Sequence, residues 1–310
     1  MINRICLIVC FVFFTTSIFA QQTNNEVEVT KEVYKEIDEV ELSINIYVPE
    51  KRANNNGAIV LIHGGGWNSG SPAAMNKYAK HFSERGLVVF TPQYRIRNKN
   101  NTTIYEAVQD VKSVMDWVVG NSDKYNFDLD YLSVGGGSAG GHLATTTVFM
   151  PELGASEKGI EYKVKCFVLF NPVLDVSKDG YGHNKVKTEL EAYNLTWQQF
   201  SPIDNIKENL APTIVVVGDR DKVLPVKTAE RFKMIMEEKG NECKLKIYPG
   251  AEHSFFNYGY GTKQGYPKGT SNKYYYEVLQ ELDNFLVSQN MLDEKIKIEI
   301  PKEAIYPIRK

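Results

Sequence analysis

A serine flanked by glycines stands out in the stretch VGGGSAGG, residues 134–141. Gly136, Ser138 and Gly140 match the pattern G-x-S-x-G, with an apolar run before it and the helix-capable HLATTTVFM after it. At a sharp strand-to-helix turn, a serine adopts a strained backbone and projects its hydroxyl, while side chains two positions away would collide. The helix that follows offers free N–H groups and the positive end of its dipole. Ser138 is therefore the candidate nucleophile, and the alternative is a glycine-rich turn with an incidental serine.

A serine hydroxyl is a weak nucleophile and needs a base, so the histidines are the next candidates. His253 lies in the loop YPGAEHSFF, after the last strand-like run, and loops at the carboxyl ends of parallel strands gather where sites form. We predict that His253 is the base, and the alternative is a loop histidine that caps a turn. The other four are expected at the surface (His81), packed within a helix (His142), in a glycine stretch (His63) and in an insertion (His183).

The base needs a carboxylate that fixes its tautomer and stabilises the imidazolium. The segment VVVGDRDKVLP follows the penultimate strand-like run and holds Asp219 and Asp221. We prefer Asp221 as the acid, which leaves Asp219 as a turn residue. Glu252 adjoins His253 and is expected to point elsewhere. The order serine, aspartate, histidine is the one that G-x-S-x-G hydrolases use.

A second glycine stretch, HGGGW at residues 63–67, follows another apolar run. Acyl transfer passes through a tetrahedral oxyanion, and backbone N–H donors approach it closely only where side chains are absent. We assign these donors to Gly65, Gly66 and Ala139, and expect His63 and Trp67 to brace the loop. A phosphate-cradling loop would be the competing use of consecutive glycines, but the pattern G-x-x-x-x-G-K-[ST] is missing at both stretches.

Strand-like and helix-like segments alternate along the chain. Two alternating segments, 26–37 and 41–49, predict a hairpin at a sheet edge. Apolar runs typical of strands buried on both faces follow at 58–62, 87–91, 132–135, 166–170, 213–218 and 245–249. Helical stripes of apolar residues begin at Ile104, Ala229 and Tyr275. This alternation predicts an α/β fold with a mainly parallel central sheet flanked by helices.

The organisation that we predict is one catalytic domain over residues 21–290. Residues 174–209 are longer than an ordinary connection and predict a short, cap-like insertion over one end of the sheet. Residues 291–310 form a charged tail, in which KIKIEI (295–300) is a candidate added edge strand.

The first 20 residues have the pattern of a secretory signal peptide. Arg4 supplies a positive charge, Cys6 to Phe14 is apolar, and a small residue, Ala20, precedes a polar segment. We predict cleavage near Ala20 and export to the periplasm or the exterior. The alternative is a membrane anchor, but the apolar run is short of the roughly 20 residues that a span needs. Lipid attachment at Cys10 is disfavoured because Val9 stands where a small residue is expected.

Composition excludes several other classes of protein. The net charge is −2 and the chain shows no basic stripe with interleaved aromatics, so we expect no nucleic-acid partner. The histidines are scattered and there is no cysteine cluster, so we predict no metal and no cofactor. Cys166 and Cys243, the cysteines outside the signal segment, are expected to be two buried thiols rather than a disulfide.

Together, HGGGW, GGSAGGHLA, GDRDKVLP and YPGAEHSFF resemble the esterase/lipase group of α/β-hydrolases. The chain is similar to the hormone-sensitive-lipase-like carboxylesterases, and more closely to secreted bacterial esterases of the acetylxylan and feruloyl esterase type, over about Ile44 to Val287. The segment TPQYRIRN resembles the family's Tyr-Arg segment after the fourth strand. The chain departs from the pattern at Gly137, where many relatives carry Asp or His. It also has no room for the N-terminal helical cap, which argues against long acyl chains.

The resemblance implies a serine hydrolase that acts on small-molecule or carbohydrate esters, with no stable membrane insertion. We expect a short acyl group, acetyl or an aromatic acid, because no N-terminal cap is expected to form a long apolar tunnel. We expect a carbohydrate alcohol because the first segment predicts export and aromatic residues crowd the segments near the predicted triad. The candidate substrate contacts are Trp67, Tyr181, Trp197 and Phe255. The alternative is that these rings only pack.

Three other functions stay open at this point. One is a general short-chain carboxylesterase. Another is a serine peptidase of the same fold, although the chain lacks the length for the propeller domain of prolyl-oligopeptidase relatives. The last is a non-catalytic binding protein on a hydrolase scaffold, although no triad member is missing.

Overall fold

The strand that leads into Ser138 lies inside an eight-stranded sheet with the order β1-β2-β4-β3-β5-β6-β7-β8. The computed structural model describes residues 25–153, 163–261 and 270–307. Strands β3 to β8 run parallel to one another. Strands β1 and β2 form an antiparallel hairpin, and β2 also pairs antiparallel with β4. The strands are β1 (Val27–Ile37), β2 (Val40–Pro49), β3 (Ala58–Ile62), β4 (Val88–Pro92), β5 (Leu132–Gly137), β6 (Phe167–Phe170), β7 (Thr213–Gly218) and β8 (Cys243–Tyr248).

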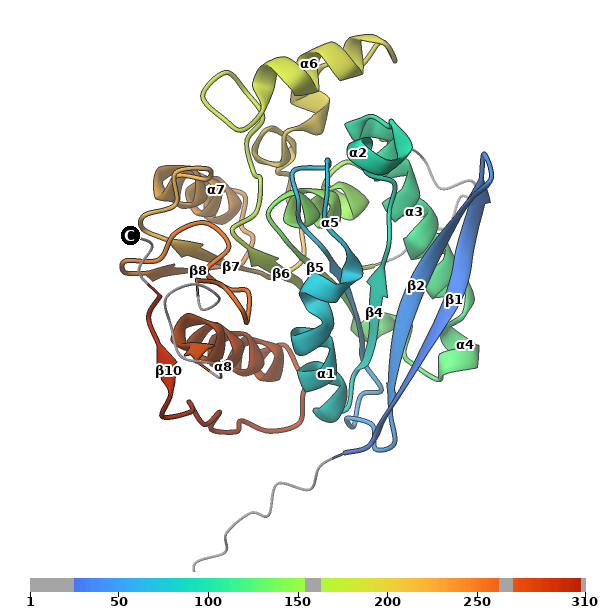
Figure 1. Cartoon of the computed structure of the whole chain (residues 1–310). Coiled ribbons are helices and arrows are strands. Elements are labelled where there is room, and N and C mark those ends of the chain that lie inside the picture. The colour runs from blue at the N-terminus through green and yellow to red at the C-terminus, as the bar shows by residue number, and fades with distance from the viewer. Residues whose placement is uncertain (1–24, 154–162, 262–269, 308–310) are drawn as a thin grey trace, which may run out of the picture.

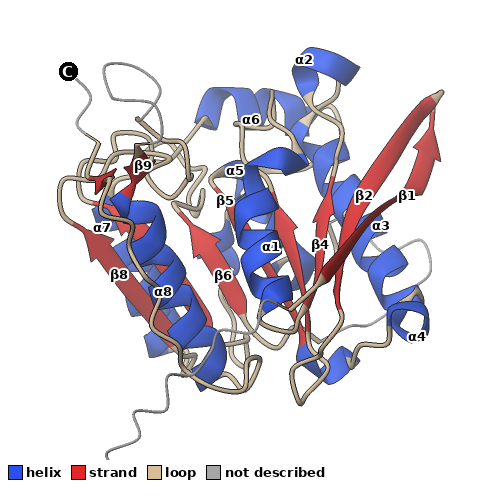
Figure 2. Cartoon of the chain, turned by 60° about the horizontal axis from the view of Figure 1, so that its bottom comes forward, coloured by secondary structure: helices blue, strands red, loops and turns tan. Residues whose placement is uncertain are grey.

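Helices cover both faces of this sheet (Figures 1 and 2). In Figure 2, α1 and α8 lie in front of the strands; they pack on one face, whereas α3, α5 and α7 pack on the other. The helices are α1 (Asn76–Glu84), α2 (Arg97–Asn100), α3 (Ile104–Gly120), α4 (Ser122–Tyr125), α5 (Ala139–Phe149), α6 (His183–Glu191), α7 (Val226–Glu238) and α8 (Lys273–Ser288). Short 3₁₀ turns are η1 (Pro72–Met75), η2 (Leu129–Tyr131), η3 (Trp197–Phe200) and η4 (Pro202–Asn205).

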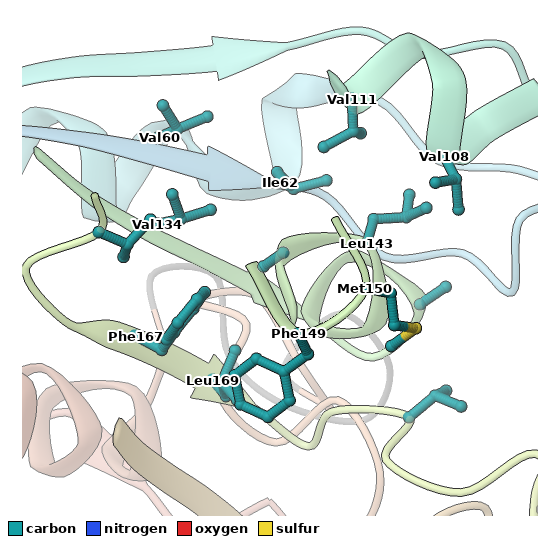
Figure 3. Close-up of a cluster of buried hydrophobic side chains, with 14 of the residues drawn as sticks. Val60, Ile62, Val108, Val111, Val134, Leu143, Phe149, Met150, Phe167 and Leu169 are labelled. Carbon is teal, nitrogen blue, oxygen red and sulfur yellow. The ribbon is translucent and has the colours of Figure 1, made fainter. Parts of the chain in front are cut away.

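Two buried clusters, one on each face, hold these layers together. Successive strand residues point to opposite faces, so Ile59 and Leu61 join the cluster under α1 and α8, while Val60 and Ile62 join the other. Figure 3 shows the second cluster, where Val60, Ile62 and Val134 of the sheet meet Val108 and Val111 of α3 and Leu143 and Phe149 of α5. Burying each such side chain stabilises the fold by about 1.5–3 kcal/mol.

The fold class predicted from the sequence is confirmed. The hairpin lies at the sheet edge, and each strand predicted between residues 26 and 249 is present within two residues at its start and end. The exposed edge strand β1 carries a bulge between Val33 and Lys35 and alternating charges. Such features discourage pairing with another chain.

The candidate edge strand at 295–300 is wrong, because this segment runs beside α8 instead of pairing with the sheet. The side chain of Gln280 takes the place of a strand partner: its Nε2 donates to Ile296 O and its Oε1 accepts from Ile298 N. A two-stranded parallel pairing forms nearby between β9 (Ser271–Asn272) and β10 (Ala304–Ile305).

Residues 174–209 contain α6, η3 and η4, between β6 and β7. In Figure 1, α6 lies at the top, above the sheet. The predicted signal segment, residues 1–20, lies outside the described residues. None of the helices in the described part of the chain combines the length and apolar composition needed to span a bilayer.

The Tyr-Arg segment after β4 anchors the glycine loop that follows β3. Tyr94 Oη donates to His63 O (3.0 Å), and the two rings stack with centroids 4.3 Å apart. Arg95 is buried, and its Nε and Nη2 donate to the two carboxylate oxygens of Asp110 on α3 at 2.8 and 2.9 Å. Lys35 of the hairpin also binds Asp110 (3.0 Å). The buried carboxylate of Asp110 on α3 therefore connects the hairpin with the Tyr-Arg segment that contacts the glycine loop.

Candidate active site

Ser138 is the single residue between the end of β5 and the start of α5, and its backbone has φ 54° and ψ −119°. Its N–H donates to Phe170 O (2.8 Å), and its carbonyl accepts from the N–H groups of Gly141, His142 and Val173 at 3.0–3.2 Å. These bonds tie the turn to β6 and to the first turn of α5. They hold a positive φ that costs on the order of 1–3 kcal/mol for a residue with a side chain.

The flanking glycines are required by close backbone contacts. A Cβ at Gly136 would lie 2.4 Å from Gly140 O, and one at Gly140 would lie 2.2 Å from Ile62 O and 2.5 Å from His63 O. The turn thus brings the end of β3, with its glycine loop, directly against the start of α5. This confirms the prediction that side chains at Gly136 and Gly140 would collide with the backbone.

The structure brings the three predicted triad residues into one hydrogen-bonded chain. Ser138 Oγ lies 3.0 Å from His253 Nε2, and His253 Nδ1 lies 2.8 Å from Asp221 Oδ2. Because a carboxylate only accepts, His253 Nδ1 carries the proton and Nε2 is free to accept the serine proton. The residues follow β5, β7 and β8, at the carboxyl ends of parallel strands.

Asp221 rather than Asp219 faces the histidine. The Oδ1 of Asp221 accepts from the backbone N–H groups of Val223 (2.8 Å) and Leu224 (2.9 Å). Burial favours the neutral acid, but the hydrogen bond and charge of His253 and these two N–H groups outweigh it, so the pKa of Asp221 lies below its ordinary value. Asp219 accepts from Gly250 N (2.7 Å), as expected for a turn residue.

Asn171, which directly follows β6, belongs to the site although the sequence does not predict it. Its Nδ2 donates to Asp221 Oδ2, the same oxygen that binds His253. It is fully buried and has φ 41°, and its Oδ1 has no hydrogen-bond partner in the described part of the chain. The unpaired Oδ1 and the positive φ both lower the stability of the fold, which indicates that the function of Asn171 is to position the carboxylate of Asp221. No sequence signal separates it from the other asparagines.

The loop that carries His253 is fixed from three sides. Tyr78 Oη donates to Phe256 O (2.8 Å), and Asn272 Nδ2 donates to Phe255 O and to Asn257 O. Glu252 points away from the site and accepts from Tyr260 Oη (2.8 Å), as predicted.

The glycine loop lies beside the nucleophile. A Cβ at Gly64 would lie 3.2 Å from Ser138 Cβ, and Gly65 and Gly66 have φ 127° and φ 61°. The N–H groups of Gly65 and Gly66 find no acceptor among the described residues. Ala139 is the first residue of α5, where N–H groups lack an intrahelical acceptor. His63 and Trp67, at the two ends of the glycine stretch, are buried: His63 stacks on Tyr94, and Trp67 packs edge-on against His142.

A pocket of about 420 Å³ opens at Ser138 and His253. Of the four candidate substrate contacts, the structure places Tyr181 on its wall. Phe255 is fully buried among Tyr248 and Tyr274, and its neighbour Phe256 lines the pocket instead. Trp67 is buried, and Trp197 packs against His183, so both lie off the wall.

The remaining histidines lie outside the chain of hydrogen bonds. His142 is packed as predicted and faces Phe200 O (2.7 Å). The surface prediction for His81 is wrong, because it is half-buried and binds the buried Asp283 (3.0 Å). Cys166 and Cys243 are free and buried, as predicted. In the described ranges, no group of three or more His, Cys, Asp or Glu residues could hold a metal.

A protein-family model, BD-FAE, matches residues 44–236, which is more than half of the chain. The chain belongs to the BD-FAE family. The matched segment contains Ser138 and Asp221 but ends before His253.

Two curated relatives that are similar to this chain are esterases. The chain is 26% identical over 258 residues to an acetylxylan esterase of Xylanibacter ruminicola, covering 78% of this chain and 47% of that protein. It is 27% identical over 217 residues to the esterase LipC of Mycobacterium tuberculosis, covering 64% and 52%. The chain thus spans about half the length of these curated relatives.

Among solved structures, esterase 2 of Thermogutta terrifontis with bound propionate is similar, with 34% identity and a TM-score of 0.75. The alignment covers 89% of this chain and 98% of that one. The same esterase is also known with bound butyrate and phosphorylated by paraoxon. These likenesses confirm the α/β-hydrolase fold and the resemblance drawn from the motifs.

The two aspartates near His253 provide a matched pair of variants. Asp221→Asn is expected to lower kcat on p-nitrophenyl acetate by about 10⁴-fold, because an amide disturbs the tautomer of His253. Asp219→Asn keeps an acceptor for Gly250 N and should stay within about threefold of the parent. Equal losses in the two variants, or a larger loss in Asp219→Asn, would contradict this assignment.

Two buried histidines predict a loss of stability in mild acid. Burial lowers the pKa of His63 and of His142 from 6.5 to about 4, so both stay neutral in the folded protein while the unfolded chain takes up protons. The free energy of unfolding should therefore fall between pH 6.5 and 4, by on the order of 3 kcal/mol per histidine.

Urea unfolding at these two pH values measures this loss. His142→Gln, which keeps a donor for Phe200 O, should reduce the loss, whereas His183→Gln at a partly exposed position should not. An unchanged loss in His142→Gln would count against the buried neutral imidazole.

Proposed function

We propose that this protein is a serine carboxylester hydrolase that removes short acyl groups from carbohydrate esters. The observation that carries the proposal is the chain of hydrogen bonds from Ser138 through His253 to Asp221. Ser138 and His253 line a pocket together with Gly65 and Gly66, whose N–H groups have no acceptor among the described residues. The esterase relatives support this class of reaction.

The geometry supports an acyl-transfer mechanism. His253 Nε2 takes the proton of Ser138 as its Oγ attacks the ester carbonyl, and Asp221 stabilises the imidazolium. The oxyanion that forms is stabilised by the N–H groups of Gly65, Gly66 and Ala139, which need no reorganisation. His253 then donates its proton to the leaving alcohol, which leaves the acyl group on Ser138 Oγ. Water next attacks this acyl-enzyme while His253 Nε2 takes its proton, and His253 returns that proton to Ser138 Oγ as the carboxylic acid leaves.

Three observations support a short acyl group. Met75 and Phe256 close the pocket against Gly137, where a Cβ would lie 2.6 Å from the Phe256 ring. The structures of the Thermogutta esterase hold propionate and butyrate. A long apolar tunnel would also need a cap, and the described residues before β3 form the hairpin β1–β2.

The carbohydrate part of the proposal is supported by the acetylxylan esterase relative. Residues 1–20 predict export, which would bring the enzyme to carbohydrate polymers outside the cytoplasm. N-terminal sequencing of the secreted protein would test this, and a mature chain that begins near Gln21 is the expected result.

The nucleophile is tested by Ser138→Ala, which replaces a small residue by a smaller one. Activity on p-nitrophenyl acetate should fall by several orders of magnitude, leaving roughly 10³-fold over water from the N–H groups and binding. Far-UV circular dichroism should be unchanged. Near-parent turnover in a folded variant would remove Ser138 from the reaction.

The acyl group is tested by kcat/KM on p-nitrophenyl acetate, butyrate and octanoate. We expect a fall of about tenfold or more from butyrate to octanoate, because the chain meets Met75 and Phe256. Phe256→Ala should narrow that difference. A steady rise toward octanoate would contradict the short-acyl proposal, and equal rates on acetylated sugars and alkyl acetates would leave a general short-chain carboxylesterase.

A further inference from the structure

The pocket beside Ser138 has two walls of different character. Met75, Val223 and Phe256 form an apolar wall. Tyr181 and Asn68 also line the pocket and form a polar wall next to the glycine loop. The position that a Cβ of Gly66 would take lies 3.1 Å from Tyr181 Oη and 3.7 Å from Asn68 Nδ2. Both polar atoms therefore lie next to the loop that is proposed to bind the oxyanion.

The amide of Asn68 is oriented by Lys185 of α6. The Lys185 ammonium has only donors, so the Asn68 atom that it binds must be Oδ1. The Asn68 NH₂ group then faces the pocket, and it has no acceptor in the part of the chain that the structure describes. A charged donor fixes this orientation more firmly than a neutral one would.

The hydroxyl of Tyr181 is also free within the described residues. Its ring packs on Trp67 with centroids 5.7 Å apart, which holds the side chain in place. By contrast, two other polar side chains that line the pocket bond within their own loops: Ser69 Oγ donates to Gly65 O and Asn257 Nδ2 donates to Ser254 O. Oriented and unpaired donors at a pocket wall indicate a ligand with acceptor oxygens.

The electrostatic surroundings favour the same kind of ligand. None of the described residues that line the pocket is an aspartate or a glutamate. The carboxylate nearest to Lys185 is that of Glu189, 4.0 Å away, which is already paired with Arg97 and with Ile104 N. The polar wall is thus a donor-rich surface with a positive charge behind it.

We propose that Tyr181, Asn68 and Lys185 form a subsite for the alcohol part of the ester, and that this alcohol is polyhydroxylated. The acyl group lies against Met75 and Phe256, and the sugar hydroxyl and ring oxygens accept from Tyr181 Oη and Asn68 Nδ2. The subsite rests on the hydrolase function proposed above and names the residues of the insertion that recognise its substrate.

The experiment compares two esters with the same acyl group, acetylated xylobiose and p-nitrophenyl acetate. The ratio of their kcat/KM values reports the alcohol part alone. Tyr181→Phe removes one hydroxyl without changing the ring and should lower this ratio about three- to tenfold. Lys185→Met frees the Asn68 amide to rotate and should lower the ratio in the same direction.

Matched controls lie on the same insertion. Tyr193→Phe changes an exposed tyrosine whose hydroxyl lies near Thr103, and Lys187→Met changes an exposed lysine of α6. Both should keep the parent ratio. If folded Tyr181→Phe and Lys185→Met kept the same ratio of kcat/KM values as the parent protein, the subsite alone would be overturned, provided that both esters were still hydrolysed in a Ser138-dependent way. If the parent protein showed no Ser138-dependent hydrolysis of either ester, that result would instead overturn the proposed function.

Discussion

The close contact of β3, β5 and α5 at Ser138 is the constraint on which the site depends. The backbone of Ser138 (φ 54°, ψ −119°) persists only because hydrogen bonds to Phe170 and Val173 hold it. Gly140 in turn touches the carbonyls of Ile62 and His63, so the glycine loop is seated by the same contact. One packing arrangement therefore positions both the nucleophile and the N–H groups that would face the oxyanion.

The sequence predicts those parts of the structure that follow from local rules. Glycine at 136 and 140 is a steric requirement of the turn, so the spacing around Ser138 is informative without any knowledge of the fold. Apolar runs give the parallel strands, and the loops after them give Asp221 and His253, because carboxyl ends of parallel strands meet at one edge. The choice of Asp221 over Asp219 agrees with the hydrogen bonds in the structure.

The features that the sequence did not predict depend on distant contacts. Whether Phe255 or Phe256 faces the pocket is decided by the conformation of the loop, in which Ser254 has φ 69°. Asn171 follows β6 and binds Asp221, which follows the neighbouring strand β7. His81 binds Asp283, which lies about 200 residues later in the chain. Residues 295–300 alternate like a strand, but Gln280 of α8 satisfies their backbone groups. No pattern of short range contains this information.

We propose that Ser138 attacks an electrophile whose developing oxyanion is bound by the N–H groups of Gly65, Gly66 and Ala139. A crystal structure of the protein after reaction with paraoxon tests this proposal directly, because the phosphoryl group on the nucleophile mimics the tetrahedral intermediate. We expect one diethylphosphoryl group on Ser138 Oγ, with its phosphoryl oxygen about 2.7–3.1 Å from these N–H groups. A modified residue other than Ser138, or a phosphoryl oxygen turned away from the glycine loop, would show that the proposed nucleophile or oxyanion site is wrong.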